Sequence, residues 1–128
     1  MLHTQRGYGG SCVAPHHLAA SAGRDVLKQG GNAVEAMVAA AAAIAVVYPH
    51  MNALGGDGFW LIHEPGKAPI AIDACGPAAG LASADFYAGE TQIPERGPKA
   101  ALTMAGTIGG WHEALNVASA WGKQLPLT

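Results

Sequence analysis

The chain has 128 residues, which is enough for one ordinary domain, but its composition is unusual for a domain that stands alone. Half of the residues are hydrophobic and only 12% are charged, about half of the roughly 25% that is typical of a soluble domain. We therefore expect other protein to cover much of its surface. The net charge is -2 and the 7 Lys and Arg residues stand singly along the chain, a pattern that excludes the clustered basic surface of a nucleic-acid-binding protein.

No secretion signal or membrane span is predicted. The first residues lack an apolar stretch, so we expect a cytoplasmic protein, although export directed by residues upstream of Met1 stays open. The longest apolar run, residues 36–48, is shorter than the roughly 20 residues that a helix needs to cross a bilayer. Cys12 and Cys75 are far apart and form no ligand pattern with histidines, so we expect two reduced, buried thiols, with one disulfide as the alternative.

The first half of the chain predicts an extended segment or short strand and then two helices. Residues 7–14 alternate small and apolar side chains before a proline. Residues 16–29 predict a helix that ends at a pair of glycines, with a lysine in its last turn. Asn32 is placed to cap a second helix over residues 33–47. Because that helix is apolar on every side after Glu35, we expect it to be buried on every side.

The second half predicts a hairpin, a long loop and a final helix. Residues 59–63 and 69–73 predict two strands joined by a Glu-Pro-Gly-Lys turn. Residues 74–99 are rich in loop-forming residues, with a short helix expected at 83–87. A strand is expected at 100–105, and the glycines at 109–110 are expected to lead into a helix that carries Trp111.

Simple chemical motifs indicate no reaction. The glycine-rich loop at residues 55–58 lies between a helix and a strand, the opposite order to a phosphate-binding loop. His16 and His17 are adjacent and point to different sides of a helix, so they cannot bind one metal ion together, and we expect no metal or other cofactor. Four carboxylates could act as an acid and base pair only if the fold gathers them: Asp57, Asp73, Asp85 and Glu113.

Three blocks of sequence together resemble one known family. They are Val13-Ala-Pro-His-His-Leu-Ala-Ala, Gly30-Gly-Asn-Ala-Val-Glu-Ala and Pro49-His-Met-Asn-Ala-Leu-Gly-Gly-Asp-Gly-Phe59. In this order and at this spacing they look like the start of the gamma-glutamyltranspeptidase family. A later segment, Gly106-Thr-Ile-Gly-Gly-Trp111, resembles the family's Pro-Gly-x-x-x-Gly segment, with Ala105 where proline is usual.

This resemblance implies an α/β fold, the four-layer αββα sandwich of the N-terminal-nucleophile hydrolases. Such proteins are made as one precursor that cuts itself into a large and a small subunit, and the new N-terminal Thr of the small subunit is the nucleophile. Residues 1–128 then form an incomplete N-terminal portion of the large subunit, with no complete second domain and with the remainder of the precursor as their partner. We expect this stretch to contain no catalytic residue and to be inactive alone.

The activity that the resemblance implies is transfer of a gamma-glutamyl or related acyl group from an amide, such as glutathione, to water or an amino acid. One position departs from the family pattern Asp-x-Arg-Glu-x-Ala-Pro, whose Arg grips the α-carboxylate of the donor. Here the stretch is Asp73-Ala-Cys-Gly-Pro-Ala-Ala, so Cys75 stands in the place of that Arg. We treat Cys75 as a candidate substrate-binding residue, and Arg96 as a candidate source of the missing charge.

A second hypothesis comes from a different class of protein. Because the Arg is absent, the chain could belong to a non-catalytic relative that acts as a scaffold or interaction subunit. A Thr nucleophile segment in the rest of the protein distinguishes the enzyme from the scaffold.

Overall fold

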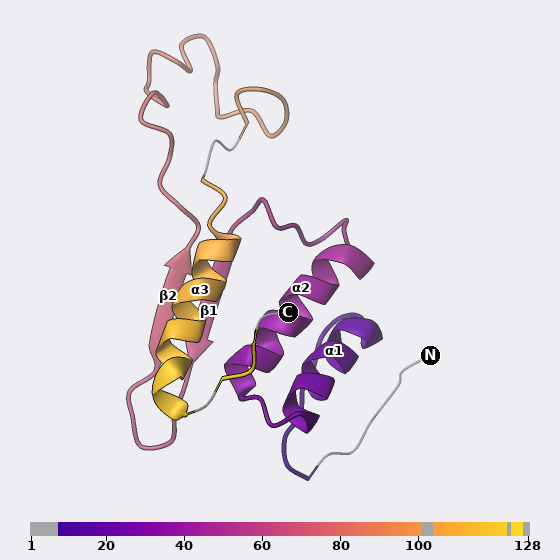
Figure 1. Ribbon diagram of the computed structural model, residues 1–128. Helices are drawn as coiled ribbons and strands as arrows, with labels where there is room; N and C mark the ends of the chain where they lie inside the picture. The colour runs from indigo at the N-terminus through magenta and orange to yellow at the C-terminus, as the bar shows by residue number, and fades with distance from the viewer. Residues whose placement is uncertain (1–7, 101–103, 123, 127–128) are drawn as a thin grey trace.

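The computed structural model describes residues 8–100, 104–122 and 124–126 of the chain. Two groups of elements lie side by side (Figure 1). One is a pair of helices, α1 (His17–Lys28) and α2 (Ala33–Val47). The other is a hairpin of β1 (Gly58–Ile62) and β2 (Ile70–Ala74), covered on one face by α3 (Thr107–Ala118) and followed by a short 3-10 turn, η1 (Ser119–Trp121). Between β2 and α3 the chain makes a long excursion that projects away from both groups.

Local signals in the sequence set the ends of the first two helices. The Nδ1 atom of His16 accepts a hydrogen bond from the Leu18 amide at 3.3 Å and so caps α1, which ends before Gly30 at a φ of 88°. Asn32 caps α2 by accepting from the amides of Val34 and Glu35, both at 3.0 Å. The carboxylate of Glu35 accepts from the Asn32 amide at 2.7 Å, which completes a capping box.

The two N-terminal helices pack closely because small residues lie between them. Gly23 of α1 is buried, and a Cβ at this position would lie 2.7 Å from the Ala36 carbonyl oxygen of α2. The same Cβ would overlap the Cys12 thiol, which lies against α1. Both Cys12 and Cys75 are free thiols, as predicted, but both are half-buried and not fully buried.

The expectation that α2 is buried on every side is wrong for this chain. One side of the helix is buried, including Val34 and Val38, but Met37 is 43% exposed and Val46 is 77% exposed. The reason is that α1, α3 and the hairpin together cover only part of its circumference. None of the helices in the described part of the chain is long and apolar enough to span a membrane.

The predicted hairpin is confirmed. Strands β1 and β2 pair antiparallel, with Gly58 opposite Ala74 at one end and Ile62 opposite Ile70 at the turn. Helix α3 packs on the face that carries Ile62, and the resulting core joins α3 to α2 through Val34, Val38, Ile62, Ala114 and Ala118. Trp60, Trp111 and Trp121 lie partly buried around this core.

Three other expectations are corrected, and one open alternative is decided. The final helix begins at Thr107, before its glycines, because Gly110 lies where α3 crosses the hairpin, and a Cβ there would lie 2.8 Å from that of Ala74. Residues 83–87 form turns, in which the Ser83 hydroxyl accepts from the Phe86 amide, instead of a helix. For residues 8–14 the sequence left open a short strand or an extended segment, and the structure has no strand there. Of the strand expected at 100–105, residues 101–103 lie outside the described residues, and the others form no strand.

Candidate functional site

The open end of the hairpin brings together the loop before β1, the residue after β2 and the start of α3. Gly58 pairs with Ala74 at this end of the antiparallel ladder. Asp57 and Cys75 are the next residues beyond that pair, so they lie opposite each other. The first turn of α3 lies against the same place, because a Cβ at Gly106 would overlap the Ala74 carbonyl. Cys75 is therefore held at a junction of three segments that are far apart in the sequence.

A tight turn fixes the orientation of Cys75. The carboxylate of Asp73 accepts a hydrogen bond from the Cys75 amide at 3.1 Å, and the Cys75 Sγ atom lies 3.6 Å from the Gly76 carbonyl oxygen. Gly76 has a φ of 70°, and a Cβ on it would overlap Met104. The chain turns sharply away from the hairpin immediately after Cys75. Because this turn needs a positive φ and leaves no room for a Cβ, glycine fits the position more easily than any other residue.

The surroundings of Cys75 are negatively charged. A hydrogen bond to the Asp73 carboxylate, burial, and the negative charges of Asp73 and Asp57 all raise the pKa of the Cys75 thiol above its ordinary value. The same hydrogen bonds, from the thiol and the amide of Cys75, lower the pKa of Asp73. The thiol is thus neutral at pH 7, and it has none of the positive charge with which an arginine would bind a carboxylate.

Thr107 ties the glycine-rich loop to the start of α3. Its hydroxyl lies 2.6 Å from the carbonyl oxygen of Gly56 and 3.1 Å from that of Asp57, and its amide donates to Gly56 at 3.0 Å. Thr107 is only 7% exposed, so these bonds form away from water. The loop carbonyls point at a protein hydroxyl, an arrangement unlike that of a phosphate-binding loop, in which backbone amides surround an anion.

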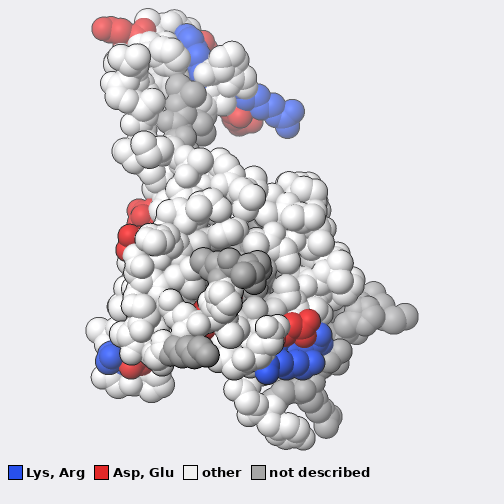
Figure 2. Space-filling model, in the orientation of Figure 1, with Lys and Arg blue, Asp and Glu red and all other residues white. Residues whose placement is uncertain are grey.

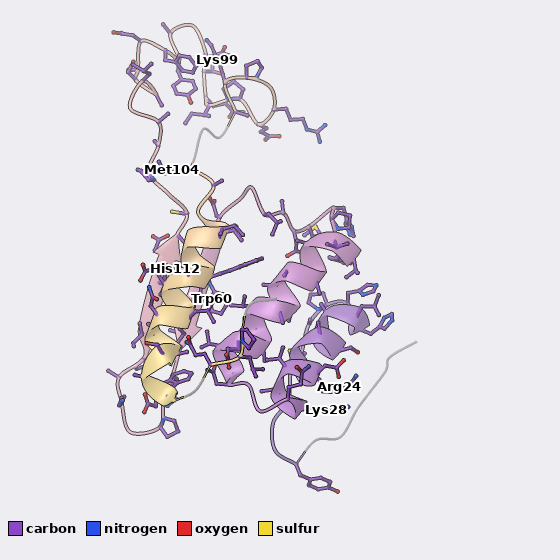
Figure 3. All side chains as sticks on the ribbon, viewed as in Figure 1. Arg24, Lys28, Trp60, Lys99, Met104 and His112 are labelled. Carbon is purple, nitrogen blue, oxygen red and sulfur yellow. The ribbon has the colours of Figure 1, made fainter. Side chains whose placement is uncertain are left out.

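An open cleft of about 710 Å³ begins at this loop and runs between α2, β1 and α3. Its walls are mainly apolar and include Met37, Ala41 and Ile44 of α2, Trp60 of β1 and Trp111 of α3. Trp60 lies in the space between α3 and α2 (Figure 3). The polar residues that line the cleft include His50, Asn52, Asp57 and Thr107.

Arg96, the second candidate residue, lies elsewhere. It is exposed in the projecting segment, where Lys99 pairs with Glu90 at 3.4 Å and lies 5.6 Å from the ring centre of Phe86. No hydrogen bond or ion pair joins Arg96 to Cys75 among the residues that the structure describes. Charged side chains are sparse on the face shown in Figure 2, and several of them gather on this segment.

The remaining candidate groups are only partly brought together. Asp57 and Asp73 lie at the same end of the hairpin, whereas Asp85 is in the projecting segment and Glu113 is at an exposed position of α3. The rings of His16 and His17 stack with their centres 4.6 Å apart at the start of α1. Within the described residues, no group of three or more His, Cys, Asp or Glu side chains could hold a metal ion.

Sequence reasoning missed Asp57 and Thr107 as neighbours of this site. Counting outward from the predicted turn would have placed Asp57 opposite Cys75, because an antiparallel ladder pairs residues in opposite order. No pattern in the sequence signals the Thr107 contact, since about fifty residues separate it from the loop that it holds.

Comparison with known proteins identifies relatives of the chain. The sequence model described as gamma-glutamyltranspeptidase matches residues 19–128. The oxamate amidohydrolase proenzyme of Klebsiella pneumoniae is 61% identical over 119 residues, a match that covers 92% of this chain and 22% of that protein. The glutathione hydrolase-like YwrD proenzyme of Bacillus subtilis is 44% identical over 104 residues, covering 80% of this chain and 20% of that protein.

The solved structures agree. The gamma-glutamyltranspeptidase of Pseudomonas nitroreducens, complexed with L-DON, superposes with a TM-score of 0.73 at 34% identity and covers 90% of this chain and 34% of that chain. The fold is therefore that of the N-terminal part of the large subunit of such an enzyme, which is part of an N-terminal-nucleophile hydrolase sandwich. The chain spans about a fifth of the length of the curated relatives that it matches.

Proposed function

Because the chain belongs to the gamma-glutamyltranspeptidase family, a family of enzymes, we propose that the full-length protein is an amidohydrolase of a short acyl amide such as oxamate. In this proposal residues 1–128 supply part of the wall of the donor site, and the rest of the precursor supplies the nucleophile. Water is the acyl acceptor. The observation that carries the proposal is the neutral Cys75, hydrogen-bonded to Asp73 and near the negative charge of Asp57, at the position where the family resemblance implies a carboxylate-binding Arg.

The charge around Cys75 argues against gamma-glutamyl donors. The α-carboxylate of such a donor lies several bonds from the amide that is cleaved, and it needs a positive partner at that distance. Asp57 and Asp73 would repel it, and a protonated thiol cannot form a bidentate ion pair. In oxamate the carboxylate is bonded directly to the amide carbon. It therefore stays near the reacting atoms and needs no partner at the position of Cys75.

The names of the relatives support the same proposal. The relative with 61% identity is named an oxamate amidohydrolase proenzyme, whereas the glutathione hydrolase-like YwrD proenzyme is 44% identical and a glutathione hydrolase proenzyme of Bacillus subtilis is 38% identical. Glutathione hydrolysis is the second candidate, and it requires another cation to hold the α-carboxylate. Arg96 is the candidate for that role, although it is exposed on the projecting segment.

The test compares donors that differ in one group. The mature full-length protein is assayed for ammonia release from oxamate, and for aniline release from a gamma-glutamyl anilide and from a 4-aminobutanoyl anilide, which lacks only the α-carboxylate. We expect oxamate to be the better substrate and the two anilides to be similarly poor. Cys75→Arg should raise kcat/KM for the gamma-glutamyl anilide, relative to the other anilide, by about tenfold or more, because a charge-assisted hydrogen bond contributes about 1.5–3 kcal/mol.

Two control variants complete the design. Cys75→Ser keeps a small neutral side chain and should leave the ratio of the two anilides unchanged. Arg96→Ala should also leave it unchanged, since Arg96 makes no contact with the site among the described residues. A wild-type enzyme that strongly prefers the gamma-glutamyl anilide, with a ratio that Cys75→Arg does not alter, would contradict the role of Cys75. Absence of turnover on all three donors would favour the scaffold hypothesis.

A further inference from the structure

The first turn of α3 lies at the open end of the hairpin, between two parts of the candidate site (Figure 1). On one side, a Cβ at Gly106 would overlap the Ala74 carbonyl at the end of β2. On the other side, the Thr107 hydroxyl is bonded to the loop before β1 and lies 3.1 Å from the Asp57 carbonyl oxygen. These two adjacent residues therefore set the distance between the loop that carries Asp57 and the strand end that precedes Cys75.

Thr107 supports the glycine-rich loop at residues 55–58. Among the described residues, a Cβ at Gly55 or Gly56 would meet no atom within 4 Å, so the loop has open space beside it at both positions. At Gly58, the three nearest atoms to such a Cβ all belong to Thr107. The amide and the hydroxyl of Thr107 both donate to the Gly56 carbonyl oxygen, at 3.0 and 2.6 Å. Because Thr107 is only 7% exposed, water does not readily replace these bonds, and the loop backbone rests on this buried residue.

Asp57 depends on this support because the residue itself is exposed. Its place opposite Cys75 is set by the loop backbone and by the ladder, in which Gly58 pairs with Ala74. The pKa of the Cys75 thiol is raised first by the hydrogen bond to Asp73, and the negative charge of Asp57 adds to the rise, so this charge reaches residue 75. The same charge repels a donor carboxylate that lies near residue 75. A shift of the loop would weaken that repulsion.

We propose that Thr107 is a positioning residue of the donor site: its buried hydroxyl holds Asp57 opposite residue 75, and so helps to exclude donors that carry a carboxylate several bonds from the amide. Thr107 acts through Asp57 and does not itself contact the donor. The proposal rests on the function proposed above, since it places residue 75 in the wall of the donor site. A purely structural role would instead lower the turnover of every donor by the same factor, because only the fraction of folded enzyme would change.

The first test measures donor choice in the mature full-length enzyme, as the ratio of kcat/KM for the gamma-glutamyl anilide to that for the 4-aminobutanoyl anilide. We expect Thr107→Val and Asp57→Asn each to raise this ratio about threefold, the size of effect that is typical of one charge near a protein surface. Thr107→Ser keeps the hydroxyl and should keep the wild-type ratio. The double variant Thr107→Val/Asp57→Asn should match Asp57→Asn, because the loop then carries no charge to displace.

Three outcomes would overturn the positioning role: a ratio that Thr107→Val leaves unchanged, a ratio that Asp57→Asn leaves unchanged, or additive effects in the double variant. The Asp57→Asn result decides even where Thr107→Val disturbs folding. Ammonia release from oxamate is measured separately. An enzyme that shows these ratio changes but does not hydrolyse oxamate would refute the choice of donor proposed above and leave the role of Thr107 standing.

The second test needs no turnover. Alkylation of Cys75 by iodoacetamide is followed by mass spectrometry as a function of pH in the full-length protein, which gives the pKa of this thiol because the thiolate is the reactive form. Asp57→Asn and Thr107→Val should both lower that pKa, because the charge of Asp57 is removed in one variant and moved away in the other. Thr107→Ser should leave it unchanged. If the pKa of Cys75 is the same in Thr107→Val as in the wild type, the hydroxyl does not hold Asp57 in place and the proposal is wrong.

Discussion

Removal of the Thr107 hydroxyl tests whether this one side chain holds the glycine-rich loop in place. Thr107→Val keeps the shape of the side chain but removes the donor that reaches the carbonyl oxygens of Gly56 at 2.6 Å and Asp57 at 3.1 Å. Gly56 keeps a second bond, from the backbone amide of residue 107 at 3.0 Å. The Asp57 carbonyl loses its bond from the hydroxyl. Loss of a hydrogen bond at a site that is 7% exposed costs about 1–3 kcal/mol.

The matched control is Thr107→Ser, which keeps the hydroxyl and removes one methyl group. The methyl contributes about 0.8 kcal/mol when fully buried, so the serine variant should be the more stable of the two. Stability is measured as the free energy of unfolding in denaturant on the full-length protein, and loop opening as hydrogen exchange over residues 55–58. If Thr107→Val is as stable as Thr107→Ser and its loop exchanges no faster, the hydroxyl does not hold the loop and the reasoning fails.

Three further predictions concern close contacts. Gly110→Ala should lower the denaturation midpoint, because the new Cβ would press on β2. Gly109 has open space around it, so Gly109→Ala should stabilise the helix by about 0.5–1 kcal/mol. Equal effects of the two substitutions would refute this packing. Lys67 and the indole N–H of Trp121 lower the pKa of Glu64 in the folded protein. The stability that this carboxylate adds is therefore fully present when the pH is above the pKa of the unfolded chain, about 4.5, and is lost as the pH falls through the lower pKa of the folded protein. Trp121→Phe should raise the pKa of Glu64, as followed by NMR. Glu35→Ala should cost about 1–3 kcal/mol in denaturant melts, more than Glu35→Gln, because the buried carboxylate accepts two backbone N–H bonds.

Nearby residues in the sequence determined the local structure of this protein. The Asn32 and Glu35 capping box, the glycine after α1 and the Glu-Pro-Gly-Lys turn each act within a few residues of the chain. Hydrogen bonds over such short separations form in almost any tertiary setting, so the bounds of α1, α2 and the hairpin could be predicted. The family blocks in the first half of the chain likewise indicate the family by themselves, because they are read from residue identity and spacing alone.

Tertiary packing decided the features that sequence reasoning predicted wrongly or missed. Glycine disfavours helix, yet α3 runs through Gly109 and Gly110, because only a glycine at position 110 lets the helix approach β2. The predictions for residues 83–87 and for the burial of α2 fail for a related reason: a local pattern does not say which neighbours will cover it. The site depends on the same long-range packing. The sequence singled out Cys75. Only the pairing of β1 with β2 and the position of α3 brought Asp57 and Thr107 near it. These contacts join segments that are far apart in the chain, so no local pattern in the sequence could predict them.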